Sequence, residues 1–184
     1  YYSKKTTVGI LVSGNINQFT LRDGLNQTVQ YTSAGTALTR LNTFNNVGNP
    51  SHNYAANFNF KHTYDSTGRE LTIDLDYARF VDNSGSNLRS QFQKGDFSTL
   101  RPDSLLLNNA NSLVDQYSFK LDYVLPSFLK SKWGTGLKSS YVKTDNDLRF
   151  QGKNDGASSY TLLTGQSNHF VYEEQIHAAY LNTE

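Results

Sequence analysis

Residues 54–64 read YAANFNFKHTY, and apolar and polar side chains alternate along this stretch with a period of two. The even positions are aromatic or alanine except for His62, whereas the odd positions are Ala, Asn, Lys and Thr. Residues 71–78, LTIDLDYA, restart the alternation after the turn-like run 65–70. Successive side chains of a β-strand point to opposite faces, so the two stretches predict a hairpin of two-faced strands.

The same alternation recurs before and after this hairpin and predicts one all-β domain over residues 1–184. Its architecture is an antiparallel up-and-down meander of about six long strands, with eight as the alternative count. The predicted strands lie near residues 5–17, 52–64, 71–83, 111–125, 133–150 and 167–181. Strands of soluble sandwiches have about 5–6 residues, whereas a bilayer-spanning strand needs about 9–11. The predicted strand lengths therefore favour a segment of a transmembrane β-barrel.

The connections between these strands alternate in length. Residues 65–70 and 126–132 form short connections, whereas residues 18–51, 84–110 and 151–166 form long ones rich in Asn, Ser, Gly and Thr. Short turns on one side and long loops on the other are typical of outer-membrane barrels. Strand-like stretches at 37–46 and 87–93 are expected to extend the neighbouring strands above the membrane.

Composition excludes several classes of protein. The 184 residues have a mean hydropathy of −0.59, yet they include 12 Tyr and 11 Phe, which disfavours disorder. The net charge of +1 shows no basic excess for nucleic acid. There is no cysteine, hence no disulfide framework. No stretch approaches the roughly 18 apolar residues of a membrane helix, and alternating strands remain the only spanning element predicted.

The two faces of the predicted sheet differ in chemistry, and the aromatic residues cluster toward the ends of the apolar face, as at a lipid headgroup boundary. The residues predicted to face lipid are Tyr54, Phe58, Phe60, Leu71, Ile73, Leu75, Tyr77, Phe119, Leu121, Tyr123 and Trp133. The residues predicted to point together into a polar lumen are Asn57, Asn59, Lys61, Asp74, Asp76, Lys120, Asp122, Lys138, Glu173 and Gln175.

Three strand segments carry a family resemblance: Lys5 to Ile10, Asn57 to His62, and Ser167 to Tyr180, together with the run from Gly134 to Lys143. They resemble the barrel of TonB-dependent outer-membrane receptors, in the branch called the outer membrane β-barrel protein family. The resemblance implies a 22-stranded barrel in the outer membrane of a Gram-negative bacterium, with a plug domain inside it. It also implies uptake of a scarce or large solute, such as a metal chelate or a glycan, driven through the TonB complex.

The sequence departs from a complete receptor, because it has no plug, no TonB box and no terminal aromatic residue. It begins at Tyr1 without a methionine and stops at Glu184 directly after a strand-like segment. We therefore expect a partial barrel whose partners are the plug domain, the remaining barrel strands and outer-membrane lipid. Isolated from lipid, its apolar face and open sheet edges are expected to cause self-association.

No motif for catalysis, a cofactor or a metal is found, and the chain is expected not to be an enzyme. His169 and His177 are about 26 Å apart on one strand, which is too far to share an ion. The run from Asp145 fails the calcium-loop pattern, because Phe150 stands where glycine is required and Gly156 where glutamate is required. The long loops carry the aromatic residues expected to contact solute: Tyr31, Phe44, Phe92, Phe97 and Tyr160.

Two other interpretations remain open from the sequence. One is a soluble carbohydrate-binding β-sandwich, in which aromatic rings stack on sugars, and it requires two packed sheets. The other is a small closed eight-stranded membrane barrel, and it requires the first and last strands to pair.

Overall fold

The computed structural model describes residues 5–128, 131–154 and 156–183, and these residues form one antiparallel β-sheet. Its strands are β1 (Thr6–Tyr31), β2 (Ala37–Thr63), β3 (Glu70–Lys94), β4 (Thr99–Phe128), β5 (Ser131–Asn154), β6 (Thr161–Leu162) and β7 (Asn168–Thr183). Each long strand pairs with the next along the chain, and β6 and β7 both pair with β5. The predicted all-β meander of six long strands is confirmed, with the two-residue β6 in addition.

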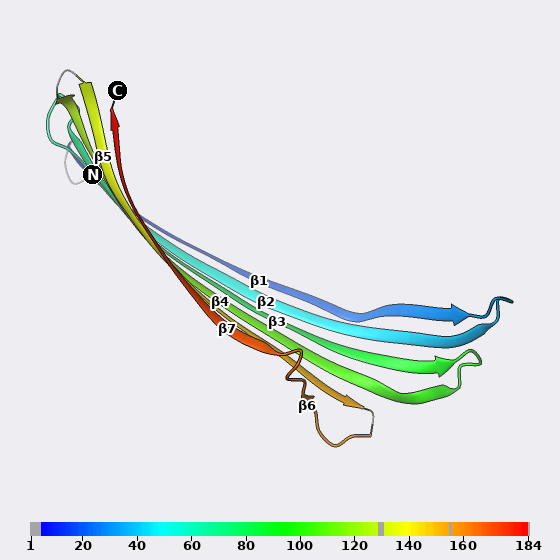
Figure 1. Ribbon diagram of the computed structural model, residues 1–184. Helices are drawn as coiled ribbons and strands as arrows, with labels where there is room; N and C mark the ends of the chain where they lie inside the picture. The colour runs from blue at the N-terminus through cyan, green and yellow to red at the C-terminus, as the bar shows by residue number, and fades with distance from the viewer. Residues whose placement is uncertain (1–4, 129–130, 155, 184) are drawn as a thin grey trace.

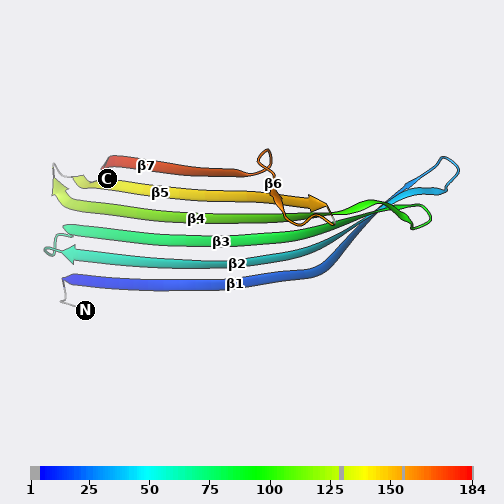
Figure 2. The same cartoon turned by 90° about the horizontal axis from the view of Figure 1, so that it is seen from below.

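The strands form a single twisted and curved layer, and none of the described residues forms a second layer over either face (Figures 1 and 2). The turn between β2 and β3, the start of β1 and the end of β7 lie at one end of the sheet, and the tips of the β1–β2 and β3–β4 hairpins lie at the other. Among the described residues, no helix has the length and apolar character needed to cross a membrane.

Two of the three connections expected to be long loops, residues 18–51 and 84–110, are mostly strand, whereas residues 151–166 contain strand only at 151–154 and in β6. β1 and β2 pair almost continuously from Thr6↔His62 to Tyr31↔Ala37, so only residues 32–36 form the turn between them. Likewise, β3 and β4 leave only residues 95–98 between them. The stretches 37–46 and 87–93 extend their strands, as predicted. The alternation pattern did not reveal the other strand residues in these connections. A bulge between Leu21 and Gly24 reverses which β1 side chains face which side, and polar residues occupy both faces there.

The sheet has no hydrophobic core: no hydrophobic or polar side chain among the described residues is buried. The accessible surface is 12646 Å², whereas a folded monomer of 20.7 kDa is expected to expose about 8,900 Å². A packed sandwich would bury one face of each sheet, so the sandwich interpretation is wrong for this fold. Within the described ranges β1 and β7 do not pair, so the closed eight-stranded barrel is not formed either.

Candidate membrane-facing belt and polar face

The pairing register shows which side chains share a face, because directly opposed residues of antiparallel strands point to the same side. One row of partners across the sheet consists of Ile10, Phe58, Leu75, Phe119, Ser139 and His177. We call the side with this row the belt face. The opposite side, which carries the row Asn59, Asp74, Lys120 and Lys138, is the polar face.

All eleven residues predicted to face lipid lie on the belt face, and eight of the ten predicted lumen residues lie together on the polar face. Glu173 and Gln175 are the exceptions. They pair with Lys143 and Tyr141 and therefore lie on the belt face, which corrects the expectation that all ten point one way. In β7 both sets of alternate positions contain apolar residues, so only the pairing with β5 determines which set faces which side.

The belt face carries an apolar belt between two groups of tyrosine and tryptophan. The upper girdle consists of Tyr77, Tyr117 and Tyr141, whose neighbouring ring centroids lie 4.9 and 6.1 Å apart. The lower girdle consists of Tyr64, Tyr123 and Trp133, and the rings of Tyr64 and Tyr123 lie 6.2 Å apart. The two girdles span seven residues on β4, from Tyr117 to Tyr123, and nine on β5, from Trp133 to Tyr141. The span on β5 reaches the roughly 9–11 residues of a tilted spanning strand.

Directly above the upper girdle, the belt face becomes charged. Arg79, Asp115, Lys143 and Glu173 follow one another across β3, β4, β5 and β7. Arg79 lies 3.8 Å from Asp115, and Lys143 lies 3.1 Å from Glu173. The Tyr77 hydroxyl donates a hydrogen bond of 2.9 Å to Asp115. Tyrosine hydroxyls next to charges, with apolar side chains below, are typical of a membrane–water boundary.

The polar face carries hydrogen bonds and ion pairs both within strands and between neighbouring strands. Asn57 donates to Asp76 at 2.6 Å and accepts from Asn59 at 2.9 Å. Lys120 pairs with Asp122 at 2.6 Å, and Lys61 pairs with Glu70 at 2.8 Å. A face with this density of satisfied polar groups suits a wet lumen or a protein surface rather than hydrocarbon.

Glycines on the polar face make room for side chains from the neighbouring strand. A Cβ on Gly136 would lie 2.3 Å from the Tyr180 ring. The Tyr180 hydroxyl crosses this glycine and donates to Asp122 on β4, so one side chain connects β7, β5 and β4. Asn59 over Gly9 and Asn182 over Gly134 repeat this arrangement. The sequence-based prediction missed these contacts, because a glycine's opposite residue is known only once the register is known.

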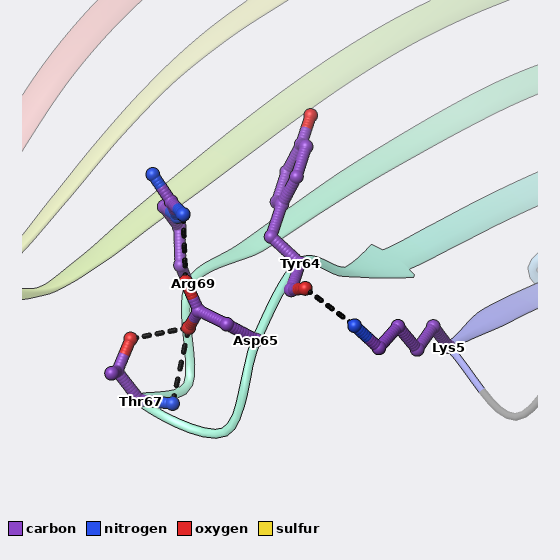
Figure 3. A network of polar contacts seen from close by, with 5 residues as sticks. All are labelled: Lys5, Tyr64, Asp65, Thr67 and Arg69. Atoms are coloured by element: carbon purple, nitrogen blue, oxygen red, sulfur yellow. Dashed lines mark hydrogen bonds and ion pairs between the residues drawn. The ribbon is translucent and has the colours of Figure 1, made fainter.

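The short turn between β2 and β3 is held by Asp65 (Figure 3). Its carboxylate accepts hydrogen bonds from the Thr67 backbone at 3.0 Å, from the Thr67 hydroxyl, and from Arg69 at 2.7 Å. The hydrogen bond from the Thr67 side chain, followed by the contacts with Arg69, lowers the pKa of Asp65 below its ordinary value. Lys5 donates to the Tyr64 carbonyl at 3.0 Å and so attaches the start of β1 to this turn.

The five aromatic residues expected to contact solute are not brought together. Phe44 lies within β2, where it pairs with Leu25 and Arg89 rather than forming part of a loop. Three of the others carry a cation over the ring: Arg101 at 3.5 Å from the centroid of Phe92, Arg40 at 4.1 Å from Phe97, and Lys153 at 4.8 Å from Tyr160. Tyr31 ends β1 and is 60% exposed.

The four histidines bind separate neighbours. His62 shares a hydrogen bond of 2.8 Å with Thr6, His177 one of 3.0 Å with Ser139, and His169 one of 2.8 Å with Asp145. The His52 ring packs at 5.4 Å from that of Tyr54. In the part of the chain that the structure describes, no three His, Asp or Glu side chains gather as metal ligands.

A comparison with protein-family models matches residues 62–184 to the outer membrane protein beta-barrel family. The matched part contains the end of β2 and every later strand. None of the curated proteins matches the chain.

Proposed function

Because the chain belongs to the outer membrane protein beta-barrel family, we propose that it forms part of the barrel wall of a TonB-dependent receptor. Such a receptor takes up a large or scarce solute, for example a metal chelate or a glycan, across the outer membrane of a Gram-negative bacterium. Its role is transport rather than catalysis.

The observation that carries the proposal is the apolar belt on the belt face. It lies between two aromatic girdles that span seven residues on β4 and nine on β5, and the reverse side of the same strands is polar and hydrogen-bonded. A soluble protein would cover the belt with a second layer, and the described residues provide none. Lipid is the solvent that suits this face.

The lengths of the connections at the two ends of the strands indicate which end faces the periplasm. Outer-membrane barrels have short turns on the periplasmic side and longer extensions outside. The turn at Asp65 then faces the periplasm, and the hairpin tips near residues 32–36 and 95–98 project outward. β3, with 25 residues, is far longer than a bilayer requires, so its outer part stands above the membrane together with the ring–cation pairs of Phe92 and Phe97.

The expected partners follow from the two faces and the two edges. The polar face would contact a plug domain, and the open edges of β1 and β7 would pair with the remaining barrel strands. The TonB complex would act through the plug.

The wall assignment is tested with two adjacent cysteine variants, Phe58→Cys and Asn57→Cys, because the chain has no cysteine of its own. Each is labelled with a fluorophore in vesicles that contain phospholipid with brominated tails. We expect strong quenching at position 58 and weak quenching at position 57, since adjacent strand residues point to opposite faces. Equal quenching at the two positions would contradict a lipid-facing belt.

Transport is tested in cells with and without the gene, supplied with a panel of radiolabelled metal chelates and oligosaccharides. We expect uptake of one class only in cells with the gene, and its loss when a protonophore collapses the proton gradient. Uptake that is unaffected by the protonophore would exclude the TonB-dependent mechanism but leave the wall assignment intact.

A further inference from the structure

The apolar belt does not continue across the whole sheet. In the row through Phe119, the belt face is hydrophobic at Ile10, Phe58 and Leu75 but polar at Ser139 and His177. In the next row toward the charged end, Tyr141 is followed by Gln175, and in the row after that Lys143 is followed by Glu173. All residues of β7 from Asn168 to Thr183 are exposed.

These residues form what we call the polar stripe: Ser139, Lys143, Glu173, Gln175 and His177. Its row through Ser139 and His177 lies between the two aromatic girdles, at the depth of the hydrocarbon. Polar and ionisable side chains at that depth are costly against lipid, and in membrane proteins they mostly face protein or water. Lipid is therefore a poor cover for this part of the belt face.

The surface beside the stripe is hollowed rather than flat. A depression of about 450 Å³ is lined by Phe119, Leu137, Ser139, His177 and Ala179, together with Lys138 and Ala178. The depression lies where the small side chains of Ser139 and Ala179 stand beside the larger ones of Phe119, Leu137 and His177. Small residues beside hydrogen-bonding side chains are typical of contacts between protein segments in a membrane.

The groups of the stripe are self-complementary. Each row pairs unlike neighbours: a lysine with a glutamate at 3.1 Å, and a serine hydroxyl with a histidine ring at 3.0 Å. A twofold axis along the membrane normal reverses the order of β5 and β7. It therefore brings Lys143 of one copy towards Glu173 of the other, and Ser139 towards His177. An isologous interface needs this kind of self-complementary patch.

We propose that the polar stripe is the contact between two copies of this protein in the membrane. The inference rests on the proposed lipid-facing role of the belt face and adds that lipid does not cover its β5–β7 part. Face-to-face contact at the stripe gives these polar groups, which are paired within each copy, further partners from the second copy. It also fills the hollow beside Ala179 and leaves the rest of the belt in lipid.

The test uses single-cysteine variants of the full chain in vesicles of phosphatidylcholine with brominated tails. Ala179→Cys lies in the hollow and removes no polar group, Leu75→Cys is the matched control in the apolar part of the same face, and Asp74→Cys lies on the polar face. We expect a fluorophore at position 75 to be strongly quenched and one at position 179 to be protected. Oxidation of a mixture of Leu137→Cys and Ala179→Cys chains should cross-link the two variants into dimers, because the twofold axis brings position 137 of one copy towards position 179 of the other, whereas Leu75→Cys chains should not cross-link.

A second variant tests the polar contacts themselves. Adding Gln175→Leu and His177→Leu to Ala179→Cys should reduce cross-linking at least about tenfold, the effect of losing one to two net hydrogen bonds. Quenching at position 179 equal to that at position 75, or undiminished cross-linking in the Leu variant, would overturn the two-copy contact. Quenching at position 75 no stronger than at position 74 would instead overturn the lipid-facing role of the belt.

Discussion

At the scale of single residues, a side-chain contact that crosses a glycine constrains the register of β7 against β5. Tyr180 lies over Gly136 and donates a hydrogen bond to Asp122. Among the residues whose burial the structure describes, Gly136 alone is buried. A single-layer sheet without a core has few ways to fix the register of an edge strand. A side chain that fits only opposite one glycine supplies such a constraint, because a slip of one residue would reverse the facing of all β7 side chains.

Gly136→Ala is expected to destabilise the pairing of β7 with β5. The added Cβ would meet the Tyr180 ring at 2.3–2.5 Å, so the ring must move and the bond to Asp122 is lost. Overpacking of this kind costs about 1–3 kcal/mol. The measurement is urea unfolding in lipid vesicles, with Gly48→Ala as control, since nothing lies within 4 Å of a Cβ there. Equal midpoints for the two variants would contradict the role of the glycine.

The turn at Asp65 predicts a pH dependence of stability. The hydrogen bonds from Thr67 and Arg69 hold the pKa of Asp65 below its ordinary value in the folded chain. Its contribution to stability is therefore present above the pKa of the unfolded chain, about pH 4, and is lost as the pH falls through the lower folded value. Asp65→Asn should unfold earlier than the native chain at pH 6, and the difference should shrink towards pH 3. A difference that does not change with pH would argue against this contribution.

At the scale of elements, the turn between β3 and β4 contacts the start of β2, outside the apolar belt. The Gly95 amide donates to the Leu38 carbonyl at 2.9 Å, and a Cβ on Gly95 would lie 1.8 Å from the Ala37 carbonyl oxygen. Arg40 of β2 then covers Phe97, which has a positive φ of 67° in the β3–β4 turn. The turn between β3 and β4 is thus held against the start of β2.

Gly95→Ala is expected to release this turn, because the methyl group and the Ala37 carbonyl cannot occupy the same space. Hydrogen exchange of the amides of residues 94–98 should be faster by at least about tenfold, the effect of about 1.4 kcal/mol. Exchange in the belt should not change. Gly165→Ala is the control, since its Cβ would meet nothing within 4 Å. Unchanged exchange in the Gly95 variant would show that the turn does not depend on this contact.

At the scale of the whole molecule, the sheet depends on what surrounds it. One layer in which no described side chain is buried, with 12646 Å² of accessible surface, gains little hydrophobic stabilisation by itself. Its backbone hydrogen bonds hold the strands together, and the apolar belt requires lipid or further protein. The folded sheet is therefore expected to be more stable in a membrane than in water.

Leu121→Arg is expected to destabilise the chain in lipid by about 2–4 kcal/mol, the cost of a cation on the lipid face near the membrane midplane. Ser118→Arg is the matched control on the polar face, where it lies opposite Asp76, and it should cost much less. The measurement is guanidinium unfolding in phosphatidylcholine vesicles. Similar losses for the two variants would contradict the assignment of the faces.

Without lipid or detergent, the chain is expected to associate. Exposed apolar side chains such as Ile10, Leu75 and Leu137, which are 74%, 45% and 51% exposed, then face water. Light scattering should show species larger than 20.7 kDa, and detergent should reduce them. A stable monomer in buffer alone would contradict an uncovered belt.

The sequence alone determined the membrane-spanning parts of the strands and the two faces of β2, β3 and β4, because side-chain alternation is a local property of extended chain. Residues 54–64 and 71–78 already showed which side chains share a side. Only the tertiary structure decided the rest. It turned most of the expected loops 18–51 and 84–110 into strand and moved Glu173 and Gln175 to the belt face. The physical reason is that the length and register of strand pairing depend on the neighbouring strand, which is distant in sequence. The bulge in β1 and the packing of Tyr180 over Gly136 are two such contacts between strands.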